Sequence, residues 1–118
     1  MIIADSSIWI DHLRSSNRRL DGLVERWEIF CHPCVIGELA CGNMSERKER
    51  LQLLRELPQA TVASHAEVLR FIERHRLMGR GVRYLDMQLL ASVAMLPGLL
   101  WTRDRRLKEA AASLGLSY

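Results

Sequence analysis

Several features that would assign the chain to a familiar class are missing from its 118 residues. No apolar run reaches 18 residues, which excludes a transmembrane helix. A secretory leader is not expected either, because a strand-like apolar stretch already begins at Ile2. Repeats and low-complexity tracts are absent, and 48% of the residues are hydrophobic, so a packed core rather than disorder is expected. These absences predict a cytoplasmic protein with a single domain over residues 1–118.

Cysteine is scarce and odd in number, with only Cys31, Cys34 and Cys41. An odd count without a leader favours reduced thiols over a disulfide framework. The stretch Cys31-His32-Pro33-Cys34 resembles half of a zinc site, but structural zinc takes four ligands and a second pair is missing. Buried structural thiols are therefore the favoured interpretation.

Aromatic residues make up only 6% of the chain, and the net charge is a modest +3. Trp9, Trp27 and Trp101 lie in apolar contexts, which predicts core positions rather than platforms for stacking bases. The slight excess of basic residues hints only weakly at an anionic partner.

The chain contains short apolar segments that alternate with helical patterns. The alternation predicts an α/β domain whose central, mainly parallel sheet has four or five short strands. In such a sheet, ligands bind outside the carboxyl ends of the strands. The expected strands cover 2–4, 29–31, 61–63, 99–102 and the edge segment 116–118; the expected helices follow Ser6 or Ser7 and Pro33 and cover 18–27, 45–57, 64–77, 84–96 and 104–114.

Four acidic residues lie where the apolar pattern predicts burial. Asp5 and Asp104 directly follow apolar strands, Asp86 shares a helical face with Leu90, and Glu38 has apolar or small neighbours. Each has an ordinary explanation: Asp is a preferred N-cap, an acid in a first turn suits the helix dipole, and Glu38 fits the exposed side of a short helix. At the first strand, however, Ser6 and Ser7 are already available as caps.

The four acids together favour a metal site. Like charges held close together raise one another's pKa and destabilise the fold, and a divalent cation removes that penalty. Mg²⁺ and Mn²⁺ prefer carboxylate and water oxygens, and such a site suits hydrolysis of phosphodiesters.

The motifs IIADSSIWIDHL, GEL, GVRYLDMQLLASV and LLWTRDRRL occur in an order and spacing that resemble the PIN-domain family, and more closely its VapC-type toxin ribonucleases. The resemblance spans essentially the whole chain. It implies a three-layer α/β/α fold and a metal-dependent endoribonuclease that is the toxin of a toxin–antitoxin pair. It also implies a Mg²⁺ or Mn²⁺ cofactor.

The resemblance assigns catalytic roles to four residues and supporting roles to two more. Asp5, Glu38, Asp86 and Asp104 match the family's four acids, with Asp5, Asp86 and Asp104 expected to hold metal. Glu38 either joins a second ion or orients the attacking water. Ser6 and Thr102 match the small polar residues that support the site.

The resemblance also implies an RNA substrate, with tRNA among the candidates, a cognate antitoxin and a homodimer, and no membrane. Helices 18–27 and 45–57 are the expected antitoxin groove, and the helix with Phe71, Ile72 and Leu77 is a candidate dimer surface, although a core role competes. Two alternatives stay open: a non-catalytic RNA- or protein-binding module, and a receiver-type phosphoacceptor, which would need adjacent acids after the first strand. The basic residues beside the third and fourth acids, which form either a solvated face or phosphate contacts, are Arg80, Arg83, Arg103, Arg105, Arg106 and Lys108.

Overall fold

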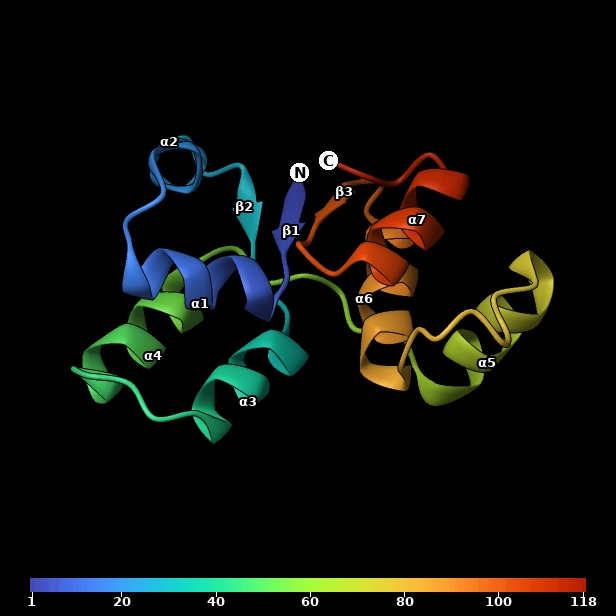
Figure 1. Cartoon of the computed structure of the whole chain (residues 1–118), viewed down its shortest axis with the longest axis horizontal. Coiled ribbons are helices and arrows are strands. Elements are labelled where there is room, and N and C mark those ends of the chain that lie inside the picture. Colours follow the sequence, from blue (N-terminus) through green and yellow to red (C-terminus); the bar gives the residue numbers. More distant parts are fainter.

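The computed structural model describes residues 1–118 as a small parallel sheet with helices on both sides (Figure 1). The strands are β1 (Ile2–Ala4), β2 (Ile29–Phe30) and β3 (Leu99–Trp101), in the spatial order β2-β1-β3. The α/β class and the parallel sheet are therefore confirmed. The helices are α1 (Ser6–Arg14), α2 (Arg18–Glu25), α3 (Pro33–Cys41), α4 (Arg47–Glu56), α5 (His65–His75), α6 (Tyr84–Met95) and α7 (Arg105–Ser113).

The central strand β1 is apolar throughout because it is buried on both faces. Ile2, Ile3 and Ala4 are all buried, as expected for a strand covered by helices on each side. Ile2 pairs with Ile29 of β2 on one side and with Leu99 of β3 on the other. All three strands therefore end at the same edge of the sheet.

The sheet has three strands, so the expected four or five strands are wrong. Residues 61–63 form no strand: the chain pairs with the end of β2 only through Cys31 and Gln59, then leaves to begin α5. The C-terminal segment likewise contributes a single bridge, between Leu100 and Ser117. In both places the pairing is too short to count as a strand.

One cluster of 26 buried apolar residues forms the core. Helix α6 is its centre, since every residue from Asp86 to Val93 is buried. Trp27 does not join the core as expected: α2 ends at Glu25, and Trp27 follows in a left-handed turn (φ 57°) with 66% of its surface exposed. None of the helices has the length and apolar character needed to cross a membrane.

The helix starts place the acids at the strand ends. The N-cap of α1 is Asp5, rather than Ser6 or Ser7, and Asp104 caps α7. Both carboxylates accept backbone N–H bonds from the first turn of the helix that follows. At the start of α5, Ser64 and Glu67 form a capping box, in which each side chain accepts from the backbone N–H of the other residue.

Candidate active site

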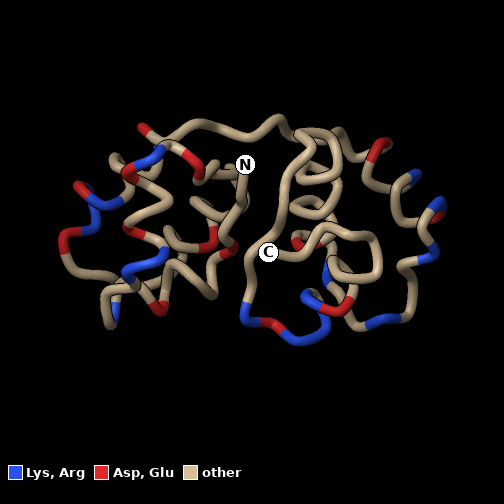
Figure 2. Tube along the Cα trace, turned by 90° about the horizontal axis from the view of Figure 1, so that it is seen from above, with Lys and Arg blue, Asp and Glu red and all other residues tan.

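The four acids come from four segments that meet at the carboxyl edge of the sheet. Asp5 follows β1, Asp104 follows β3, Asp86 lies in the first turn of α6, and Glu38 lies in α3. The starts of α1, α6 and α7 all lie at this edge in Figure 1. Figure 2 shows several acidic positions near the middle of the molecule, with most basic positions towards its periphery.

Asp5 is buried, with 5% of its surface exposed, and both of its oxygens accept hydrogen bonds. The backbone N–H groups of Ser7 and Ile8 donate to Oδ1 at 3.0 and 3.3 Å, and the Ser7 hydroxyl donates to the same oxygen. The Thr102 hydroxyl donates to Oδ2. Since every donor is a neutral group, the carboxylate is held in place without its charge being neutralised.

Ser7 and Thr102 also tie the first acid to the turn that carries the fourth. The Thr102 oxygen accepts from the backbone N–H of Asp104 at 3.0 Å. The Ser7 oxygen accepts from the backbone N–H of Arg103, also at 3.0 Å. Two hydroxyls therefore fix the start of α1 against the start of α7.

Thr102 thus has the contact expected of a supporting residue, whereas the hydroxyl beside Asp5 belongs to Ser7 rather than to the predicted Ser6. Sequence reasoning missed Ser7 because it treated the two serines as alternative caps. With Asp5 as N-cap, Ser7 is the second helical residue, and its N–H is one that the cap must satisfy. The place of Ser7 two residues after an aspartate that ends a strand was the sequence signal that could have identified it.

Asp86 is equally buried, with 9% of its surface exposed, but no hydrogen bond holds its carboxylate. Burial raises the pKa of this carboxyl above its ordinary value, and Arg83 works in the opposite direction. Glu38, Asp104 and Asp5 raise the pKa further, so the other three acids all act electrostatically on this one group. The four carboxylates make no ion pair with any Lys, Arg or His side chain.

The donor set fits a hard divalent cation. Carboxylate oxygens are the ligands that Mg²⁺ and Mn²⁺ prefer, and no ion pair neutralises any of the four carboxylates. The side chains do not stand as a preformed cluster of three metal ligands. Asp5, Asp86 and Asp104 are the residues that would hold such an ion.

The cysteine segment makes a structural contribution elsewhere. His32 is fully buried and caps α3: its Nδ1 accepts from the N–H of Cys34 at 3.0 Å, and its Nε2 lies 3.1 Å from the Ser92 hydroxyl of α6. Because Nδ1 accepts, Nε2 carries the proton and donates it to Ser92. Burial lowers the pKa of His32 and raises that of the Cys31 thiol to about 11. Both ring nitrogens are thus engaged.

The basic residues beside the acids are exposed, and each has a neighbour of its own. Arg103 pairs with Asp11 at 2.6 Å, Arg105 pairs with Glu109 at 3.2 Å, and Arg80 donates to Ser113 at 3.2 Å. Arg106 lies over Gly81. Arg83 acts on Asp86, whose pKa it lowers.

The sequence and the fold were then compared with those of known proteins. No family model matches the chain. The chain is 49% identical over 118 residues to Ribonuclease VapC32 of Mycobacterium tuberculosis, in strains CDC 1551 and H37Rv, covering 99% of this chain and 95% of that protein. The crystal structure of PAE2754 from Pyrobaculum aerophilum matches with a TM-score of 0.63 at 16% identity, covering 92% of this chain and 84% of that one, which supports the fold. The chain therefore belongs to the VapC family of PIN-domain toxin ribonucleases.

Proposed function

We propose that Asp5, Asp86 and Asp104 bind Mg²⁺ or Mn²⁺, and that residues 1–118 use this site as a single nuclease domain to hydrolyse phosphodiester bonds of RNA. The observation that carries the proposal is the environment of Asp86. Three further acids act electrostatically on this buried carboxyl, which has no ion pair of its own. Such an arrangement destabilises the fold unless a cation is bound.

When bound, the ion supplies charge neutralisation at a phosphate and lowers the pKa of water. The residues of the chain supply the rest. Thr102 and Ser7 hold Asp5 in one orientation, and Glu38 is free to orient the attacking water or to join a second ion. Ser6 remains proposed as a supporting residue beside the first acid.

The exposed arginines around the site are proposed to hold the RNA backbone. A phosphodiester approaching four carboxylates is repelled, so cations at the rim are needed to compensate. Arg83 is the best placed, because its charge already reaches Asp86. The others are Arg80, Arg103, Arg105 and Arg106. The proposed substrate is a structured RNA such as a tRNA, encountered in the cytoplasm.

The test is RNA cleavage by the purified chain, first stripped with EDTA and then given Mg²⁺ or Mn²⁺. We expect cleavage only with the metal, and its loss in Asp86→Asn at unchanged far-UV circular dichroism. Lys48→Met, on the exposed surface of α4, is the control and should cleave normally. Binding of RNA without any cleavage by the wild type would instead indicate the non-catalytic module.

Membership of the VapC family implies an antitoxin partner, and a continuous groove is proposed to bind it. A hollow of about 420 Å³ lies between α1, α2 and α4, and another of about 370 Å³ continues from it to Glu38. The floor is apolar, and α2 and α4 line it, in line with the groove expected from the sequence. The residues common to both hollows are Leu13, Arg14, Leu39, Met44 and Arg50.

Two features of this groove favour an acidic partner segment. Arg14 and Arg50 face it without an ion pair, and the buried Nε1 of Trp9 has no acceptor. An unpartnered buried donor is costly, and a partner's carboxylate or carbonyl would satisfy it. We expect Arg50→Glu to weaken binding of the cognate antitoxin. Arg55→Glu, on the same helix but outside both hollows, should leave it unchanged.

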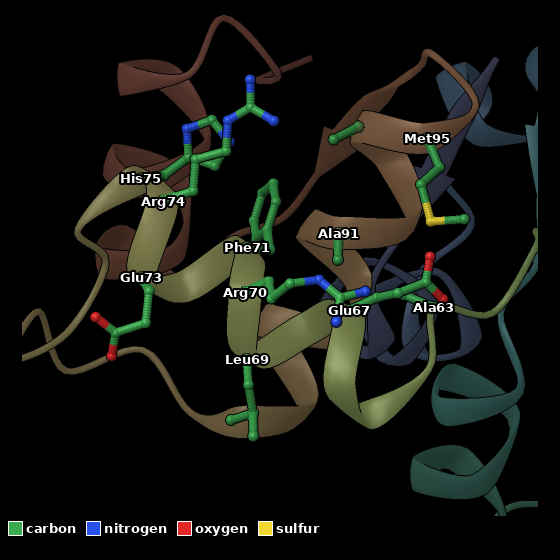
Figure 3. Close-up of a pocket in the computed structure, with 11 residues that line it drawn as sticks. Ala63, Glu67, Leu69, Arg70, Phe71, Glu73, Arg74, His75, Ala91 and Met95 are labelled. Carbon is green, nitrogen blue, oxygen red and sulfur yellow. The ribbon is translucent and has the colours of Figure 1, made fainter.

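A third hollow, of about 720 Å³ between α5 and α6, is proposed as the homodimer surface (Figure 3). Phe71 of α5 and Met95 of α6 line it, and Leu69 is 46% exposed. Leu77, the third residue considered for this surface, is instead core, with 1% exposed. Leu69→Glu should shift a dimer to monomer in light scattering, whereas Met78→Glu, exposed but outside the hollow, should not.

A further inference from the structure

An aromatic pair lies exposed where α5 and α6 begin. The rings of His65 and Tyr84 have centroids 5.4 Å apart and are tilted by 50°. The Tyr84 hydroxyl lies 2.8 Å from Nδ1 of His65. Tyr84 keeps 39% of its surface in contact with solvent, and the neighbouring Leu85 keeps 43%. These two exposed side chains begin a helix whose next eight residues are all buried.

The tyrosine ring is fixed rather than free. Nε2 of Gln88, one turn further along α6, donates to the Tyr84 hydroxyl at 2.9 Å. The hydroxyl proton is then available for Nδ1 of His65, so the oxygen is held from both sides. Gln88 is itself buried, and its Oε1 has no partner, which leaves Tyr84 as the one side chain its amide binds. A surface ring held this firmly loses little further freedom when a ligand packs on it.

The pair adjoins the proposed site without being part of it. Tyr84 follows Arg83, whose charge acts on Asp86, and precedes Asp86 by two residues. Successive helical residues are about 100° apart, so Tyr84 and Asp86 point to opposite sides of the start of α6. A base stacked on Tyr84 therefore belongs not to the nucleotide whose phosphate lies near Asp86 but to a neighbour, on a strand that continues around the start of α6 towards α5.

We propose that Tyr84, braced by His65 and Gln88, is a stacking platform for an unpaired nucleobase flanking the cleaved bond. The proposal rests on the proposed RNA-cleaving function. Aromatic rings stack with any base, and His and Tyr serve this purpose in proteins that bind single-stranded RNA. Stacking on the ring contributes favourable binding energy for the substrate. The acids contribute none, because they repel phosphates.

The experiment compares three variants by fluorescence anisotropy with a labelled single-stranded RNA in EDTA, so that cleavage is prevented. Tyr84→Leu keeps an apolar side chain but loses the ring, and we expect roughly 5- to 150-fold weaker binding. Tyr84→Phe keeps the ring and loses only the hydroxyl, so binding should stay close to that of the wild type while the unfolding midpoint falls. Tyr118→Leu changes the other tyrosine, whose ring packs on Trp101 rather than on His65, and should bind normally.

A second measurement separates base stacking from a merely structural role. RNAs with one abasic nucleotide, moved along the strand, should bind the wild type less well at one position, and Tyr84→Leu should no longer distinguish that position. Equal binding by Tyr84→Leu and the wild type, or an abasic penalty that survives the variant, would overturn the platform. A wild-type chain that binds RNA but never cleaves it with metal would instead overturn the proposed function.

Discussion

The two buried aspartates of the site are supported in opposite ways. Asp5 receives hydrogen bonds on both oxygens from a helix start and two hydroxyls, whereas Asp86 receives none. Burial and three neighbouring acids raise the pKa of Asp86. The fold therefore holds Asp5 in place by hydrogen bonds and keeps Asp86 as an unfavourable anion. The difference shows that one acid of a proposed metal site, Asp5, can also stabilise the fold. The other, Asp86, needs a bound ion to offset the cost of its buried charge.

The largest expected effect is on stability, measured in EDTA. Asp5→Ala removes the N-cap of α1 and leaves buried donors without an acceptor, so the free energy of unfolding should fall by about 2–4 kcal/mol. Asp86→Asn removes a charge that the fold disfavours, so stability should stay equal or rise. Urea titrations of both variants measure this, and equal losses would erase the contrast between the two aspartates.

The next effect is that of metal binding. Mg²⁺ or Mn²⁺ that binds only the folded chain should stabilise it by about 2.7 kcal/mol at a concentration 100 times the dissociation constant. The gain should disappear in Asp86→Asn. Differential scanning calorimetry with and without the ion measures it, with Asp21→Asn, an exposed acid of α2, as the control. An equal gain in Asp86→Asn would mean that the ion binds elsewhere.

A smaller effect concerns the support of Asp5. Thr102→Val removes the hydroxyl that holds Oδ2, and loss of such an orienting group typically costs 10–100-fold in activity or metal affinity. Cleavage rates at saturating metal should fall accordingly. The exposed Thr61 gives the matched control, Thr61→Val, which should cleave normally. If Thr102→Val also cleaved normally, the hydroxyl would have no part in orienting the acid.

The smallest effect is the contribution of Asp86 to the pH dependence of stability. Its pKa is raised in the folded chain, so the folded state binds a proton that the unfolded state releases. Without metal, stability should therefore rise as pH falls through the raised pKa, and level off below the ordinary value. The slope is at most about 1.4 kcal/mol per pH unit. Denaturation at several pH values measures it, and Asp86→Asn should flatten this component.

The sequence was sufficient where local rules and tertiary structure agree. The apolar strand 2–4, the capping box at Ser64 and the buried helix beginning at Tyr84 follow from patterns that few alternatives share. The four acids were singled out because each stands where an apolar pattern predicts burial, and the family resemblance placed them together. The predicted burial is right for Asp5 and Asp86 and wrong for Asp104, which is exposed as the N-cap of α7, while Glu38 is partly buried.

The rest depended on contacts between distant segments. Residues 61–63 look like a strand, but a strand needs a partner, and β2 is too short to offer more than one pair. The helical spacing of the apolar residues predicts that Trp27 is buried, but α2 ends at Glu25, so Trp27 does not lie on the buried face of that helix. Ser7 and Tyr84 gain their importance from Thr102, Arg103, His65 and Gln88, whose proximity no local pattern encodes.

Asp5 is both the N-cap of α1 and a proposed metal ligand, and this has a genetic consequence. A cell escaping from an active toxin can lose activity at either aspartate, but the two kinds of allele differ. Changes at Asp5 damage the start of α1 and should yield little protein, since misfolded chains are degraded. Changes at Asp86 should leave abundant, folded and inactive chains that still bind the antitoxin. In a cell that also carries an intact copy of the toxin, these chains would compete for the antitoxin and leave more of the active toxin uninhibited.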